Sequence, residues 1–111
     1  MAKITFYIKQ NDTRPVLEVF LRDERDRAVD ITGATVVFHL RNASDDTNII
    51  SSGTVTVVNS VNGQVRYSWS ATDTATALVG EAEFQVTFIG DAVETFPNDG
   101  YIKVIILDDV V

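Results

Sequence analysis

Apolar and polar residues alternate with a period of two along most of the chain. The alternation appears in separate runs at residues 4–8, 17–21, 34–40, 54–57, 65–69 and 82–88. Each run is typical of a strand that turns one face to a core and the other to water. The last run, Tyr101 to Leu107, is more apolar in both phases than the other runs. It predicts a central strand, or a strand whose second face meets a partner.

Turn signals separate these runs. They are a charged hairpin tip at Asp23 to Arg27, Thr32-Gly33, a polar loop at Asn42 to Asn48, a break at Ser52-Gly53, Asn62-Gly63, Gly90-Asp91 and Pro97 to Gly100. Short strands with turns at this spacing indicate a sandwich or a small barrel. We therefore predict an all-β fold, an immunoglobulin-like antiparallel β-sandwich of about seven or eight strands.

One segment has a helical composition. Residues 71–78 are rich in alanine and follow a possible capping serine, Ser70, which predicts one short helical turn before Gly80. No linker or repeat divides the chain, and 111 residues suit one domain, so residues 1–111 are predicted to form one. Residues 1–11 are predicted to be either an N-terminal arm or an edge strand, and an edge strand is a template for pairing with a neighbour.

Composition limits the cellular compartment and the binding partners that we expect for this chain. The chain has no cysteine, which excludes disulfides and thiol chemistry. Its N-terminus lacks the apolar run of a signal peptide, so we expect synthesis and folding in a cytoplasm. No run reaches the length of a transmembrane helix, and no membrane partner is expected. The net charge of −7 disfavours nucleic acid, since the only arginine cluster, at 22–27, alternates with acidic residues.

No constellation predicts catalysis, and the chain is not expected to be an enzyme. The only histidine, His39, lies in the polar phase of its run with no partner marked by spacing, so a surface or interface role is predicted. The acidic pairs at 45–46 and 108–109 and the cluster at 23–26 lie in separate loops without calcium-loop spacing. We interpret them as solvated charge, and we expect neither metal nor cofactor.

The aromatic residues give the candidate contacts. Trp69 shares a phase with Val65 and Tyr67, which predicts a core anchor. Tyr7 and Phe20 lie in otherwise polar phases. Together with the alternate residues of the last strand they could form an exposed apolar patch, a feature of protein contacts. The candidate interface is therefore Tyr7, Phe20, His39, Ile102, Val104 and Ile106. The alternative is that the apolar members pack inside the domain.

Five stretches together resemble a known family. They are Pro15 to Asp23, Ala28 to Arg41, Gly63 to Trp69, Glu83 to Phe88 and Glu94 to Tyr101. The chain is similar there to the immunoglobulin-like domain at the N-terminus of baseplate upper proteins of tailed bacteriophages, which small phage structural proteins also carry. The Val29 to Ala34 stretch and the Thr95 to Asn98 turn are its most specific parts.

The resemblance extends from Asp12 to Ile106, with one departure. Members of the family often have an aromatic residue soon after the glycine that corresponds to Gly80, whereas this chain has Glu81 and Ala82 there and an aromatic residue only at Phe84. We expect a small difference in packing at that corner.

The resemblance implies a virion structural protein, synthesised in the host cytoplasm. Its partners would be other virion proteins of the capsid, neck or tail and baseplate, or further copies of itself. The small size favours a head decoration or head–tail position over the baseplate. The alternative function is a carbohydrate- or host-surface-binding module, with Tyr7, Phe20, Trp69 and Tyr101 as candidate contacts.

Overall fold

The computed structural model describes residues 4–110, and in this range the secondary structure is all β, with nine strands. The strands are β1 (Thr5–Lys9), β2 (Leu17–Phe20), β3 (Thr35–Asn42), β4 (Asn48–Thr54), β5 (Thr56–Asn59), β6 (Gln64–Tyr67), β7 (Leu78–Thr87), β8 (Val93–Phe96) and β9 (Ile102–Leu107). The prediction of an all-β chain is confirmed. No helix of the described part is long and apolar enough to cross a membrane.

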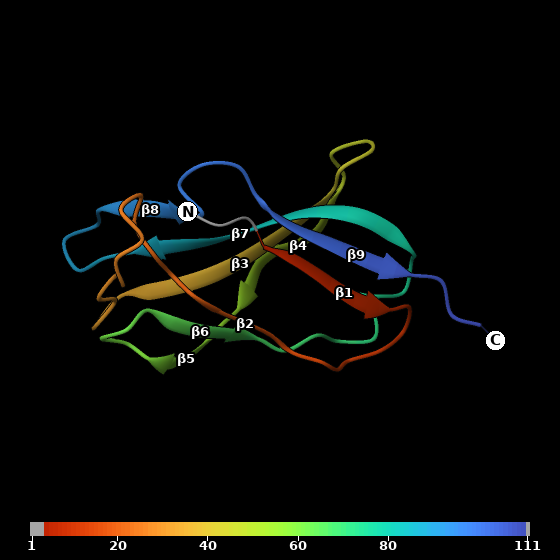
Figure 1. Cartoon of the computed structure of the whole chain (residues 1–111), viewed down its shortest axis with the longest axis horizontal. Coiled ribbons are helices and arrows are strands. Elements are labelled where there is room, and N and C mark those ends of the chain that lie inside the picture. The colour runs from red at the N-terminus through yellow and green to blue at the C-terminus, as the bar shows by residue number, and fades with distance from the viewer. Residues whose placement is uncertain (1–3, 111) are drawn as a thin grey trace.

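The strands form two sheets, which Figure 1 shows as upper and lower layers. The six-stranded sheet has the order β1-β9-β7-β3-β4, and β8 pairs with β7 beyond the end of β9. The three-stranded sheet has the order β2-β6-β5. All pairs are antiparallel except β1 with β9, which run parallel. The first strand of the chain is therefore an edge strand beside the last.

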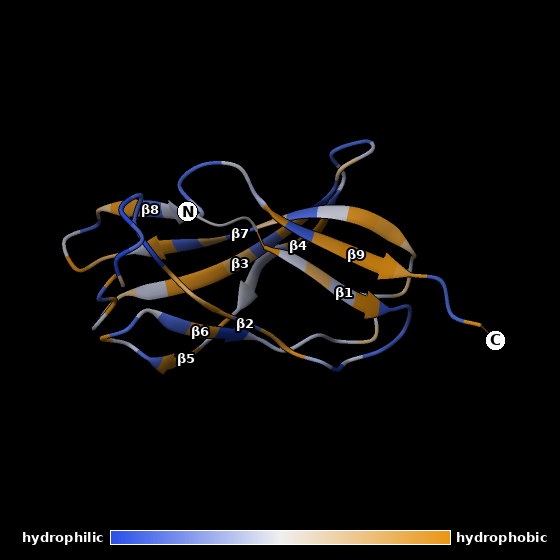
Figure 2. Ribbon diagram, in the orientation of Figure 1, coloured by the Kyte–Doolittle hydropathy of each residue, from blue (hydrophilic) through white to orange (hydrophobic). Residues whose placement is uncertain are grey.

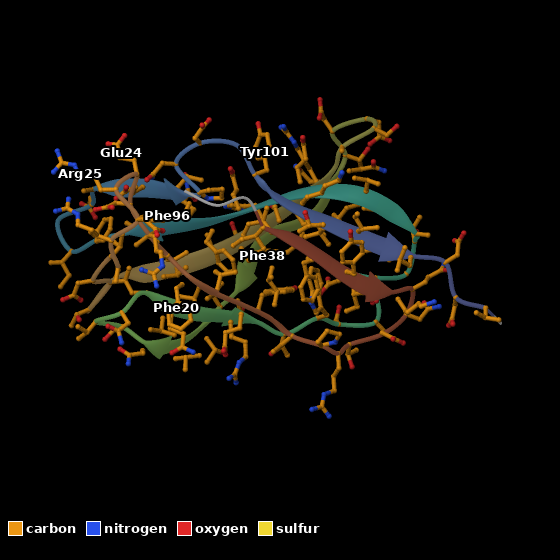
Figure 3. All side chains as sticks on the ribbon, in the orientation of Figure 1. Phe20, Glu24, Arg25, Phe38, Phe96 and Tyr101 are labelled. Atoms are coloured by element: carbon orange, nitrogen blue, oxygen red, sulfur yellow. The ribbon has the colours of Figure 1, made fainter. Side chains whose placement is uncertain are left out.

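The core lies between the two sheets and is built from the predicted inward phases. Phe38 of β3 is fully buried at its centre (Figure 3). The ring of Phe38 stacks on Tyr67 of the other sheet with centroids 4.4 Å apart, and lies 4.9 Å from Phe84 and 5.7 Å from Trp69. Trp69 also stacks on Phe6, so its prediction as a core anchor is confirmed. These offset and edge contacts are the arrangements that aromatic rings favour.

Two strands, β4 and β8, lie outside the alternating runs of the sequence. β4 occupies Asn48–Thr54, where the sequence predicts no strand and a break at Ser52-Gly53, because Ile49 and Ile50 are adjacent and no alternation is visible there. Its pairing with β3 is irregular, with register shifts on either side of Leu40. β8 follows the Gly90-Asp91 turn, whose two residues both have positive φ.

The predicted helical turn at residues 71–78 is wrong: the segment forms turns, and β7 begins at Leu78. Its polar groups bond elsewhere instead of within a helix. The Asp73 carboxylate accepts hydrogen bonds from the Tyr67 hydroxyl at 2.7 Å and the Ser70 amide at 2.9 Å. The buried Thr74 hydroxyl donates to the Asp12 carbonyl at 2.8 Å. Such side-chain bonds compete with helical ones, and a segment this short gains too little from helix formation to resist them.

The charged hairpin between β2 and β3 is confirmed. The Asp23 amide donates to the Arg27 carbonyl at 2.9 Å, and Arg22 pairs with Ala28. The Asp23 carboxylate accepts from the backbone of Arg25 and Arg27. These hydrogen bonds hold the pKa of Asp23 below its ordinary value, and the bond from the Arg27 amide has the largest effect.

Candidate docking surfaces

The predicted interface residues separate into exposed and buried groups. Tyr7 is 57% exposed and Phe20 is 47% exposed. Ile102, Val104 and Ile106 are buried, so the prediction that they line an exposed patch is wrong. They form the phase of β9 that packs against the core, and the other phase of this strand faces outward.

The outward phase of β9 meets Tyr7 instead. Tyr7 lies opposite Ile105 of β9, and Ile105 lies opposite Val79 of β7. These three residues form a row across three adjacent strands on the outer face of the six-stranded sheet, which we call the outer apolar row. Tyr7 and Val79 are exposed and Ile105 is half-buried. Figure 2 shows the strongly apolar colouring of β9 in this region.

Sequence reasoning missed Val79 and Ile105. The signal was present in β9, since its outward phase also contains apolar residues, Ile105 and Leu107, beside Lys103. Only the register shows which phase is covered and that Val79, distant in the sequence, extends the row. An apolar row of this kind marks a protein contact more often than a catalytic site.

The outer face of the three-stranded sheet differs in chemistry. Glu18 of β2 accepts two hydrogen bonds from the Arg66 guanidinium, at 2.9 and 3.1 Å, and one from Gln64 at 3.2 Å. These bonds, chiefly the one from Arg66, lower the pKa of Glu18. These bonded polar groups share their face with the exposed Phe20, which lies in the same phase of β2 as Glu18. The six-stranded sheet differs in that its apolar residues form a row across three adjacent strands.

A polar cluster borders the outer apolar row. Arg41 donates to Glu81 at 2.8 Å and to the Tyr101 hydroxyl at 3.0 Å, and its guanidinium lies 4.9 Å from the centroid of the Tyr101 ring. The Glu81 contact raises the pKa of Arg41 further above its ordinary value. A cavity of about 280 Å³ lies here, lined by His39, Leu40, Arg41, Asn48, Ser51, Glu81, Glu83 and Tyr101.

His39 is half-buried at this cavity and is held by two neighbours. The Ser52 amide donates to Nδ1 at 3.1 Å, so Nε2 carries the proton and donates to the Gln85 side-chain oxygen at 3.3 Å. Both ring nitrogens therefore have structural partners. Within residues 4–110, no three His, Asp or Glu side chains are grouped so that they could hold a metal ion.

Phe20 lines a second, smaller cavity of about 80 Å³ between the two sheets. Its walls are mostly apolar and include Ile4, Phe96, Pro97 and Tyr101. Figure 3 labels three of the aromatic rings, Phe20, Phe96 and Tyr101. The volume is that of a single side chain, so the cavity suits an anchor residue of a partner better than a substrate.

Trp69 cannot stack on a carbohydrate, because it is buried in the core. Its indole N–H is buried, with no hydrogen-bond partner among the described residues. The other aromatic candidates, Tyr7, Phe20 and Tyr101, remain exposed.

The fold and its surfaces define a class: an all-β protein of two facing sheets, with exposed apolar side chains on the outer face of the six-stranded sheet. A family model, the BppU N-terminal domain, matches residues 2–96, so the chain belongs to the family of baseplate upper protein N-terminal domains. A search of curated proteins found no match. Membership of a phage baseplate domain family implies a structural role in the virion.

Proposed function

We propose that this chain is a non-catalytic adaptor of the phage virion, which docks on another virion protein through the outer apolar row. The carrying observation is the register that aligns Tyr7, Ile105 and Val79 on one outer face. Burying exposed apolar side chains stabilises association by roughly 25 cal/mol per Å². Symmetry-related copies on a virion would add avidity, so each contact can be weak.

Within the virion we propose the tail baseplate as the position. The family takes its name from a baseplate protein, and this supports the tail. A head position is supported by the small chain size alone, which is a weaker argument. The partner would then be a tail or baseplate protein with an apolar patch of similar width.

We propose that residues 1–111 form one immunoglobulin-like domain. Support comes from the topology: the first strand pairs parallel with the last, the large sheet is built from β9, β7, β3 and β4, and β2, β6 and β5 make the second sheet. Chain crossings between two facing sheets are typical of such sandwiches.

The decisive experiment measures binding of the purified chain to tails purified from the phage that encodes it, by co-sedimentation. Val79→Asp places a charge in the outer apolar row, and binding should weaken at least about tenfold. Val58→Asp is the matched control, because Val58 is 41% exposed on the other sheet and Val79 is 45% exposed. Equal loss in both variants, or no binding of the unmodified chain, would overturn the proposal.

The second candidate function is carbohydrate or host-surface binding. It is favoured by the 280 Å³ cavity, where the exposed Tyr101 ring stands beside Arg41, Glu81 and Asn48. An aromatic ring with planar polar groups is suited to a sugar. A glycan array compares the chain with Tyr101→Ala. Binding that the variant loses would favour this function, and an array without signal would exclude it.

A further inference from the structure

The outer edge of β1 has free backbone groups. The Lys103 amide donates to the Ile4 carbonyl at 2.9 Å, and the Gln10 amide donates to the Leu107 carbonyl at 2.7 Å. Successive peptide groups of a strand point to opposite edges, so Ile4, Phe6, Ile8 and Gln10 bond to β9. The groups of Thr5, Tyr7 and Lys9 point away from it, and of these the Lys9 carbonyl accepts a hydrogen bond from the Asp12 amide at 3.1 Å. No strand pairs with that edge in the described part of the chain.

We infer that two copies of this chain associate through their β1 strands, antiparallel and centred on Tyr7, to form one continuous sheet. Tyr7 would exchange both of its backbone hydrogen bonds with Tyr7 of the second copy. Thr5 would face Lys9, and Phe6 would neighbour Ile8 on the inner side. This pairing follows from the two-fold axis at Tyr7. The Lys9 carbonyl, which accepts from the Asp12 amide in its own copy, would accept a second hydrogen bond from Thr5 of the other copy through its second lone pair.

The sequence of β1 is compatible with itself in this register. The pair on the inner side is apolar with apolar, since Phe6 is half-buried and Ile8 is buried in the same phase. The only charged residue of the strand, Lys9, faces an uncharged threonine, so no like charges oppose each other. A charged edge residue normally discourages pairing, and here it falls outside the centre.

A second copy also completes the outer apolar row. In each copy the row runs from Val79 through Ile105 to Tyr7 and stops at the free edge. Pairing at Tyr7 joins two rows end to end and brings two tyrosine rings together as a cross-strand pair, which contributes to sheet stability. A heterologous partner strand would need this pattern by coincidence, whereas a second copy has it by symmetry.

The contact is short, so the dimer is expected to be weak and dependent on concentration. Two five-residue strands bury less than the roughly 800 Å² per partner of a standard interface. Light scattering across a concentration series should show the mass rising from 12.2 kDa towards twice that value, with a Kd no weaker than about 1 mM.

Tyr7→Pro tests the backbone contact. Proline removes an N–H that points to the free edge and is tolerated on edge strands. The matched control is Val57→Pro on β5, the edge of the other sheet. The Leu21 amide of the β2 side donates to the Gly63 carbonyl, and by alternation the peptide groups of Val65 also bond to β2. Val57 lies opposite Val65. The Val57 N–H therefore points to the free edge of β5, as the Tyr7 N–H does on β1. Tyr7→Pro should remain a monomer, and Val57→Pro should associate like the unmodified chain.

Circular dichroism shows whether Tyr7→Pro is folded. If it is not, Tyr7→Lys replaces it, because it keeps the N–H but puts two positive charges at the axis. The inference is overturned if the unmodified chain stays a monomer at about 1 mM. Association of a folded Tyr7 variant like the unmodified chain, or equal loss in Val57→Pro, also overturns it.

A cysteine crosslink tests the register, because the chain has no cysteine of its own. Tyr7→Cys should form a disulfide-linked dimer on oxidation, since residues opposite each other at hydrogen-bonded positions lie about 5.5 Å apart between Cα atoms. Thr5→Cys should crosslink slowly, because Thr5 of one copy faces Lys9 of the other. The two Thr5 positions are then separated by four residues along the strand, about 13 Å. Equal crosslinking of the two overturns the register. The result is independent of tail docking, which the Val79 variant tests.

Discussion

Replacing Gly63 with alanine tests the turn that joins β5 to β6. Gly63 has φ +66°, and a Cβ there would lie 2.6 Å from the Val29 carbonyl oxygen and 2.9 Å from the Leu21 carbonyl oxygen. Both are backbone atoms and cannot turn away as a side chain could. They are also fixed, because Leu21 donates to the Gly63 carbonyl and Val29 donates to Leu21.

The magnitude has two parts. A left-handed backbone costs a residue with a side chain roughly 1–2 kcal/mol. Crowding against packed atoms adds about 1–3 kcal/mol. We expect Gly63→Ala to lose about 2–5 kcal/mol of unfolding free energy, and each kcal/mol lowers Tm by roughly 4–8 °C in a domain of this size.

Gly100→Ala is the matched control. Gly100 has φ +75°, but among residues 4–110, apart from its two chain neighbours, no atom lies within 4 Å of the position that a Cβ would take. It should therefore lose only the backbone part, about 1–2 kcal/mol. Thermal and urea unfolding followed by circular dichroism measure both variants. If the two lose the same stability, the close approach of the Val29 and Leu21 carbonyls to the turn is refuted.

Two further predictions concern titratable groups. Tyr67→Phe removes the 2.7 Å hydrogen bond to the Asp73 carboxylate and should cost about 1.5–3 kcal/mol in urea unfolding at neutral pH; no change would contradict the role of Asp73 in holding the 71–78 turns. Burial and this bond raise the pKa of Tyr67 above 10.0, so the stabilisation is present below pH 10 and is lost as pH rises through the higher pKa of the folded state. Asp23 has a pKa lowered from 3.8, so its contribution to the free energy of unfolding is present above that pH. This contribution is lost as pH falls through the lower pKa of the folded state. The Tm difference between the unmodified chain and Asp23→Asn should therefore narrow between about pH 5 and pH 2, and a constant difference would contradict the pKa shift.

The inward phases of most strands follow from the sequence alone. Val36, Phe38 and Leu40 share one phase of β3, and all three are buried as predicted. Val65 and Tyr67 behave in the same way. Alternation is a local property of a strand with one covered face, so it is visible without the partner strands.

Local composition failed where distant groups compete. Residues 71–78 have the composition of a helical turn, but their hydrogen-bonding groups are taken by Tyr67 and by the segment after β1. β4 was missed because an edge strand with an irregular register does not need a regular alternation. In both places the partner lies outside the window in which a pattern can be seen.

The candidate docking surface depended on register. The sequence by itself determined that Tyr7 lies in the polar phase of its strand and that β9 carries apolar residues in both of its phases. Only the tertiary structure decided that Ile105, not Ile102, Val104 or Ile106, faces outward beside it. The physical reason is that a shift of one residue in pairing exchanges the two faces of a strand, and that register is fixed by contacts between segments far apart in the chain.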